Sequence, residues 1–235
     1  MATQFGKQGW RLALGTRLRR LPSLTSLAFT LPVVLLYWQL GGPAAMLADP
    51  NTGVHLRAGE WILRHHAIPR QEPFSFTLAG GAWCDWEWLS DLIYAGLYRV
   101  HGLSAIVAFH LALLCLTSLT VYRTARLRVG ETVAFGVTCL VMATTTIHWL
   151  ARPHLFTWLF LGVFGFLVER ADITGEHRPL LTLPVLMILW VNLHPGFVAG
   201  LLTLGAWCAS SLLHCRLFGD GEDRFQRRKQ ALWLC

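Results

Sequence analysis

Long apolar segments separated by shorter polar ones dominate this chain. A helix needs about 20 mostly apolar residues to cross a bilayer. Six segments approach that length: residues 26–48, 103–122, 131–149, 154–168, 179–194 and 197–215. The fifth contains Pro184, which a membrane helix can accommodate where neighbouring groups satisfy the freed backbone. The pattern predicts an all-α polytopic membrane helix bundle with about six transmembrane helices.

The sizeable polar region between the predicted spans covers residues 49–102. Asp49 followed by Pro50 is typical of a helix start. An amphipathic pattern then places apolar side chains and a histidine on one face: Val54, Ala58, Trp61, Ile62 and His65. A second amphipathic pattern over residues 87–100 is too short to cross a bilayer. We therefore expect two amphipathic juxtamembrane helices in this loop, lying in the interface.

Composition and charge support a membrane protein. The chain is 54% hydrophobic and 14% charged, with a mean hydropathy of +0.47, which is too apolar for an ordinary soluble domain. If the N-terminus is cytosolic, fifteen of the twenty Lys and Arg residues fall on the cytosolic side. The positive-inside rule then predicts an inner-membrane protein with both termini cytosolic and the 49–102 loop external. The net charge of +7 indicates topology and contact with the lipid bilayer, and not nucleic-acid binding.

The predicted organisation is a basic cytosolic tail (1–25), a transmembrane module (26–217) and a second basic tail (218–235). The first apolar segment is expected to be a retained anchor. Met46 occupies the third position before the candidate cleavage point, where signal peptides carry a small residue. Of six cysteines, only Cys84 falls in the external loop, and no zinc-type spacing occurs, so the rest are expected to pack as small apolar residues.

This topology places several polar residues on one face of the membrane. The candidates come from the loop and from two later turns: Asp49, His55, Arg152, His154, Asn192 and His194. Asp85, Glu87, Asp91 and His148 lie on the same face. Each also has a plain structural reading, as a helix cap, a helix-end charge or an interfacial side chain. Arg152 is a cation on the predicted external side, where Lys and Arg are few. This placement favours an anion-binding role, such as contact with phosphate. The predicted membrane cores carry almost no charge, which disfavours a transporter.

Five segments together resemble a known family. They are DPNTGVHLRAGEWI at 49–62, PRQEPFSFT at 69–77, EWL at 87–89, ARPH at 151–154 and WVNLH at 190–194. The chain resembles, over most of residues 26–200, a family of largely uncharacterised bacterial polytopic proteins that is itself similar to the C-type membrane glycosyltransferases. Those enzymes take a sugar from a polyprenyl-phosphate carrier, and some need a divalent metal.

The resemblance implies roles for several of the candidates. Asp49 matches the acid that follows the first span, and would be the general base or, in a metal-dependent member, a metal ligand. Arg152 would pair with the carrier phosphate, and His154 and His194 would orient the carrier or the acceptor. His55 and Asn192 complete the predicted substrate-binding set.

Two features depart from that superfamily. A second acid often lies two residues after the first, where this chain has Asn51. The superfamily also usually has more than six spans, so a truncated chain that holds half a site is one expectation. The leading hypothesis is a membrane glycosyltransferase-like protein that uses a polyprenyl-phosphate-sugar donor at the external face. The alternatives are an inactive fragment or a non-enzymatic membrane assembly or binding protein, for which the tryptophan-rich loop and external histidines suggest haem handling.

Overall fold

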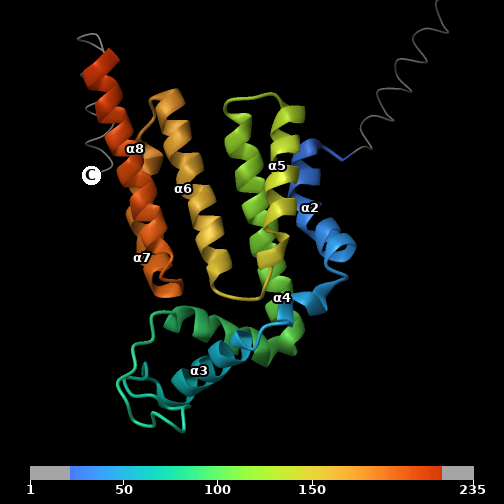
Figure 1. Cartoon of the computed structure of the whole chain (residues 1–235), viewed down its shortest axis with the longest axis vertical. Coiled ribbons are helices and arrows are strands. Elements are labelled where there is room, and N and C mark those ends of the chain that lie inside the picture. Colours follow the sequence, from blue (N-terminus) through green and yellow to red (C-terminus); the bar gives the residue numbers. More distant parts are fainter. Residues whose placement is uncertain (1–21, 219–235) are drawn as a thin grey trace, which may run out of the picture.

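The computed structural model describes residues 22–218, and its regular secondary structure is helical (Figure 1). No strand forms within that range, apart from one isolated bridge between Gln71 and Ala82. The α-helices are α2 (Leu24–Gln39), α3 (Asn51–His65), α4 (Trp88–Arg126), α5 (Glu131–Thr145), α6 (His154–Thr174), α7 (Leu183–Leu193) and α8 (Phe197–Phe218). Short 3-10 turns are η1 (Pro43–Leu47), η2 (Thr146–His148) and η3 (Arg178–Thr182). The all-α prediction is confirmed, and most of both predicted tails lies outside the described residues.

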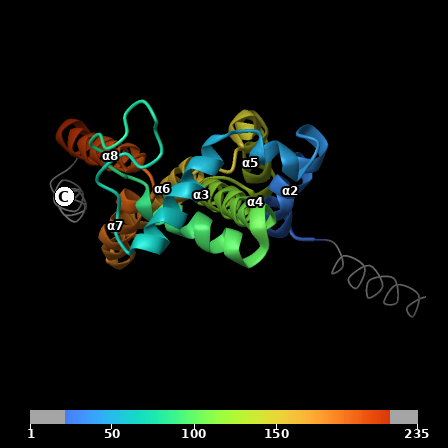
Figure 2. The same cartoon turned by 90° about the horizontal axis from the view of Figure 1, so that it is seen from below.

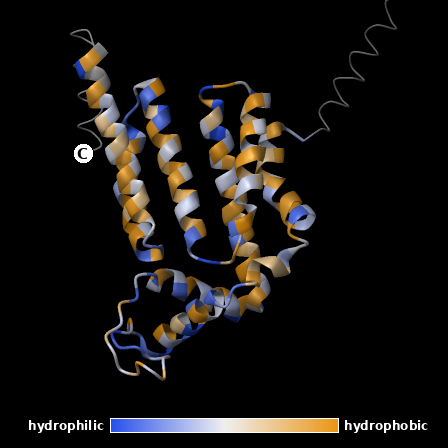
Figure 3. Cartoon of the chain, viewed as in Figure 1, coloured by the Kyte–Doolittle hydropathy of each residue, from blue (hydrophilic) through white to orange (hydrophobic). Residues whose placement is uncertain are grey.

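The helices form an upright bundle with a layer across one end. Figure 1 shows α2, α5, α6, α7, α8 and the later part of α4 standing side by side, with α3 and the first part of α4 lying beneath them. Figure 2 views the molecule from that end, where α3 crosses the bundle. Hydrophobic residues run along the upright helices, and hydrophilic residues gather at their ends and in the loop before α4 (Figure 3).

A kink in α4 separates these two parts. His101 (φ −143°, ψ 25°) and Gly102 (φ 64°, ψ −151°) leave the helical region. The Gly102 conformation is one that glycine adopts freely because it has no Cβ. The arm before the kink, residues 88–100, corresponds to the predicted second juxtamembrane helix, and the segment after it corresponds to the predicted second span. The two predicted elements are therefore one bent helix.

One helix within residues 22–218, Trp88–Arg126, is long and apolar enough to cross a membrane, which indicates membrane association. Several other predicted spans are shorter as helices than as apolar segments. The helix of the first has 16 residues, that of the third 15 and that of the fifth 11, each below the ~20 needed for a crossing. Turns η1, η2 and η3 replace helix at the ends of these segments. The six-span count therefore stays a prediction.

The layer across the bundle is held by close packing of α3 on the arm of α4. The buried residues of α3 are Thr52, His55, Ala58, Gly59 and Ile62, whereas Val54 is 46% exposed. The predicted apolar face was therefore wrong at Val54 and at His65, which is also exposed, and it missed the buried position of His55. The arm of α4 presents Asp91, Tyr94 and Ala95 to α3, where Asp91 bonds His55, Tyr94 packs on the His55 ring and Ala95 faces Gly59. A Cβ on Gly59 would lie 1.9 Å from the Asp91 carbonyl oxygen.

Candidate functional site

Three connections meet at the end of the bundle that α3 covers. They are the start of α3, the α5–α6 connection and the α7–α8 turn, and the N-terminal arm of α4 lies among them (Figures 1 and 2). The convergence predicted from the topology is therefore present. Polar side chains from these segments form a connected set, here named the polar cluster: Asp49, Asn51, His55, Asp85, Glu87, Asp91, Arg152, Thr157 and His194.

Asp49 is fully engaged at the start of α3. Its Oδ1 accepts the Asn51 backbone N–H at 2.8 Å, while the N-cap position of α3 is Pro50, one residue later than the sequence predicted. Its Oδ2 forms an ion pair with the Arg152 guanidinium. The Asp49 side chain is 9% exposed and that of Arg152 is 39% exposed. The Nε atom of Arg152 is buried and has no hydrogen-bond partner, so this guanidinium keeps unused donor capacity.

The chain around Arg152 is fixed through the residue before it. The Ala151 N–H donates to the Met46 carbonyl at 2.7 Å. The Ala151 carbonyl accepts hydrogen bonds from the Thr52 hydroxyl at 3.0 Å and from the Tyr94 hydroxyl at 2.9 Å. Three separate segments therefore hold this connection, and Arg152 is presented next to Asp49 by a rigid backbone.

His55 forms a buried dyad with Asp91. Its Nδ1 lies 2.7 Å from Asp91 Oδ1, and the two residues are 5% and 2% exposed. Its Nε2 lies 3.1 Å from the Asn51 amide nitrogen and 3.8 Å from Glu87 Oε2. An imidazole that donates from Nδ1 to the carboxylate and accepts from the Asn51 amide at Nε2 satisfies these contacts. Asn51 therefore links the Asp49–Arg152 pair, through its backbone, to the His55–Asp91 dyad, through its side chain.

The second imidazole, His194, has its tautomer fixed by its neighbours. Its Nδ1 accepts the Gly196 backbone N–H at 3.0 Å and faces the Thr157 hydroxyl at 2.8 Å. That hydroxyl accepts from the Trp190 indole N–H at 3.0 Å, so it donates to Nδ1. The proton of neutral His194 consequently lies on Nε2, 3.5 Å from Glu87 Oε1. Burial, together with the nearby charges of His154 and His55, lowers the pKa of His194 to about 4.

Glu87 lies between the two imidazoles, immediately before α4 begins. Its side chain is 25% exposed, so solvent reaches it. Burial raises the pKa of Glu87, while the His55 charge opposes the rise and Asp91 adds to it. Its backbone N–H donates to Asp85 Oδ1 at 3.3 Å. Burial also raises the pKa of Asp85, and the Oδ2 atom of Asp85 is buried without a hydrogen-bond partner.

Two predicted site residues are used to hold the fold. Asn192 Oδ1 accepts the Trp88 indole N–H at 2.8 Å, and its amide nitrogen donates to the Ile188 carbonyl at 2.7 Å. Asn192 thus ties the start of α4 to α7. His154 Nε2 donates to the His148 carbonyl at 2.9 Å and lies outside the directly bonded cluster. Its predicted contact with substrate stays a prediction.

The residues do not fit a metal centre. Within residues 22–218, no three His, Cys, Asp or Glu side chains are grouped so that they could hold a metal ion. Asp49, the predicted metal ligand, already pairs with Arg152. No chemical step is therefore assigned to a metal.

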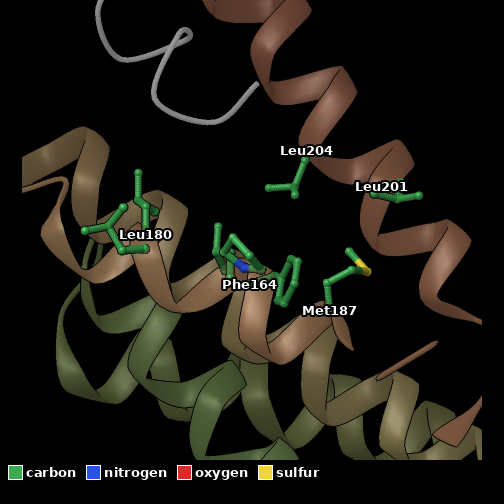
Figure 4. A pocket seen from close by; sticks show the side chains of 8 residues that line it. Phe164, Leu180, Met187, Leu201 and Leu204 are labelled. Carbon is green, nitrogen blue, oxygen red and sulfur yellow. The ribbon is translucent and has the colours of Figure 1, made fainter. Parts of the chain in front are cut away.

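An apolar cavity of about 200 Å³ lies between α6, α7 and α8, apart from the polar cluster. Phe164, Met187 and Leu204 line it with other hydrophobic side chains (Figure 4). A further cavity between α2, η1 and α4 is lined by Tyr37, Leu103 and Leu111, among others. Both belong to the upright part of the bundle.

Sequence reasoning recognised Glu87 and Asp91 as polar residues on the correct face but did not assign them to the site. Their four-residue separation, which places both on one side of a helix, was the available signal. The roles of Asn51 and Thr157 had no such signal, because both are set by contacts between distant segments. The sequence matches no protein-family model, and comparison with curated proteins and with solved structures gives no match.

Proposed function

We propose that this chain is a membrane glycosyltransferase-like protein that transfers a sugar from a polyprenyl-phosphate-linked donor at the external membrane face. The observation that carries the proposal is the junction at Asn51. There, an accessible arginine held by Asp49 adjoins a cluster of imidazoles and carboxyls at the end of an apolar bundle. Glycosyl transfer from a phosphate carrier needs both parts: a cation for the leaving phosphate and a group that accepts a proton.

Arg152 is the group suited to the phosphate. It is 39% exposed, its Nε has no partner, and the backbone on its N-terminal side is held by three segments. A guanidinium binds phosphate oxygens with two parallel hydrogen bonds, which adds orientation to charge pairing. The phosphate would share or replace the Asp49 contact, so Asp49 positions the guanidinium in the free protein.

The bundle supplies the setting for a lipid-linked donor. The segment of α4 after its kink can cross a membrane, and the polar cluster lies where that segment meets the arm across the bundle end. In the proposed topology, six spans with both termini cytosolic place this end outside. A donor can then keep its prenyl chain in the bilayer while its phosphate reaches Arg152.

The test uses the full chain reconstituted in lipid vesicles with a radiolabelled polyprenyl-phosphate sugar. We expect Arg152→Gln to raise the KM for the donor at least about tenfold. Arg99→Gln, which removes another arginine from the same predicted face, should leave the KM unchanged. We expect Asp49→Asn, which leaves Arg152 without the group that holds it, to raise the donor KM in the same direction while insertion and abundance stay normal. The absence of transfer from every polyprenyl-phosphate sugar tried would exclude the proposed function, and normal transfer by Asp49→Asn would remove Asp49 from the site.

A haem-handling role has no comparable support. Each ring nitrogen of His55 and His194 already faces a protein partner, so neither imidazole presents a free ligand atom. A Soret band on the purified protein would restore that hypothesis.

A further inference from the structure

We propose that Glu87 is the general base that takes the proton from the acceptor hydroxyl, with His194 positioning its carboxylate. This inference rests on the proposed function and names the residue that carries its proton transfer. It differs from the expectation based on resemblance, in which Asp49 has that role.

Four acidic side chains lie at this end of the bundle, and they differ in how far their oxygens are already used. Asp49 uses one oxygen for Asn51 and the other for Arg152. Asp91 is 2% exposed and bonded to His55. The free oxygen of Asp85 is buried beyond the reach of solvent. Glu87 alone among these four combines a 25% exposed side chain with oxygens that lack a close side-chain donor.

Of the two imidazoles beside Glu87, His194 is the one that presents a proton to it. His194 presents Nε2–H at 3.5 Å from Oε1, because its Nδ1 is occupied by Gly196 and Thr157. His55 lies 3.8 Å from Oε2 and is itself fixed by Asp91 and Asn51. Both contacts are longer than a strong hydrogen bond. His194 therefore orients the carboxylate through Oε1, while Oε2 faces the unprotonated Nε2 of His55 and keeps a lone pair for an incoming hydroxyl.

The chemistry balances with these groups alone. Glu87 accepts the proton of the acceptor O–H as that oxygen forms a bond to the anomeric carbon of the donor. The bond between this carbon and the phosphate oxygen breaks, its electron pair stays on the phosphate, and Arg152 stabilises the resulting charge. Desolvation favours the protonated form of Glu87, which makes its carboxylate a stronger base than an exposed glutamate.

The experiment compares Glu87→Gln with Glu60→Gln in the full chain in vesicles. Glu60 is a matched control because it lies in the same external loop and its side chain is 21% exposed, close to the 25% of Glu87. We expect Glu87→Gln to lower kcat by about 10²-fold or more while donor binding, measured by titration of tryptophan fluorescence, stays within about twofold. Glu60→Gln should retain its kcat.

Azide as the acceptor separates a base from a structural residue. Azide attacks the anomeric carbon without losing a proton, so formation of the glycosyl azide should proceed in Glu87→Gln at close to the wild-type rate. Asp49→Asn should keep its raised donor KM with azide, because its defect lies in holding Arg152. If Glu87→Gln keeps its rate with the hydroxyl acceptor, or stays inactive with azide, Glu87 is not the base even though the protein is a transferase. If the wild-type chain transfers to neither acceptor, the proposed function itself is overturned, and the role of Glu87 with it.

Discussion

At the scale of single residues, the polar cluster combines one ion pair with imidazoles whose protonation is set by their neighbours. The Asp49–Arg152 pair is only partly shielded from solvent, with 9% and 39% of the two side chains exposed. The His194 side chain is 23% exposed and is held by donors to Nδ1. Removing a charge should therefore affect stability through the Asp49–Arg152 ion pair, whereas a change of pH should affect it through His194.

Removing the charge of Asp49 should destabilise the protein through its arginine. Asp49→Asn keeps the acceptor for the Asn51 N–H but leaves the guanidinium without its counter-ion, so we expect a loss of about 1–2 kcal/mol. Arg152→Gln should cost a similar amount. Because the two groups contact each other, the double variant should lose less than the sum, by about 0.5–1 kcal/mol. Denaturant unfolding in detergent measures all three variants, and strict additivity would show that the ion pair contributes nothing to stability.

Acid should destabilise the protein through His194. The pKa of His194 in the folded protein is about 4, below the ordinary value near 6.5 in an unfolded chain. Its contribution to stability is therefore fully present above about pH 6.5 and is lost as the pH falls towards 4. The raised pKa values of Asp85 and Glu87 act in the opposite direction, because folding then favours their protonated forms at low pH.

The variant His194→Asn isolates this contribution, since its amide oxygen can replace Nδ1 as an acceptor but does not titrate. Unfolding temperatures at pH 5 and pH 7.5 should differ less in His194→Asn than in the wild-type protein. An equal difference in the two proteins would show that His194 does not control the acid response.

At the scale of helices, two glycines determine how the layer across the bundle is built. Gly59 lets α3 approach the arm of α4 so closely that a Cβ would overlap the Asp91 carbonyl. Gly102 lets α4 turn from that arm into its longer apolar segment. Position 59 requires glycine because a side chain would not fit, whereas position 102 requires it because of its backbone conformation.

Gly59→Ala should separate α3 from α4. The added Cβ would lie 1.9 Å from a backbone oxygen, which cannot move without its helix, so we expect a destabilisation of about 1–3 kcal/mol. Gly53→Ala in the same helix is the control, because nothing lies within 4 Å of its Cβ, and it should be neutral or slightly stabilising. Thermal unfolding in detergent compares the two, and an unchanged unfolding temperature in Gly59→Ala would contradict this close packing.

Gly102→Ala should strain the kink. The conformation at φ 64°, ψ −151° is almost restricted to glycine and costs other residues of order 1–3 kcal/mol. Gly96→Ala lies in the helical arm of α4 with open space around its Cβ, and should stabilise the protein by up to about 1 kcal/mol. Equal effects of the two substitutions on the midpoint of denaturant unfolding would show that α4 does not need the turn at Gly102.

The sequence predicts elements of this molecule better than contacts between them. Apolar periodicity and Asp49–Pro50 located α3, and the topology brought Asp49, Arg152 and His194 to one end. Periodicity failed at Val54 because the buried face of α3 is set by Asp91 and Tyr94, which contact His55, rather than by an apolar surface. The apolar periodicity also predicted two separate helices where the structure has the single bent helix α4, because His101 and Gly102 interrupt the periodicity without ending the helix. The role of Asn51 as a junction depends on contacts that no local pattern encodes.

At the scale of the whole molecule, the two ends of the bundle carry different polar groups. One end carries the layer of α3 and the polar cluster. At the other, the connection after α4 is tied to the end of α6 by ion pairs from Arg128 to Glu169 and Asp172. These pairs are exposed and contribute little to stability, but they mark the basic end that the positive-inside rule assigns to the cytosol.

This orientation is testable with single cysteines. Cys84 is exposed in the loop before α4, and Val129 is 39% exposed in the connection after α4 at the opposite end. In a background where the other five cysteines are replaced by alanine, a membrane-impermeant maleimide added to intact cells should label Cys84. The Val129→Cys variant, built with Cys84 also replaced, should react only after the membrane is permeabilised. Because the kinked helix separates the two sites by one crossing, labelling of both from outside would contradict a membrane-spanning α4, and the reverse pattern would place the polar cluster in the cytosol.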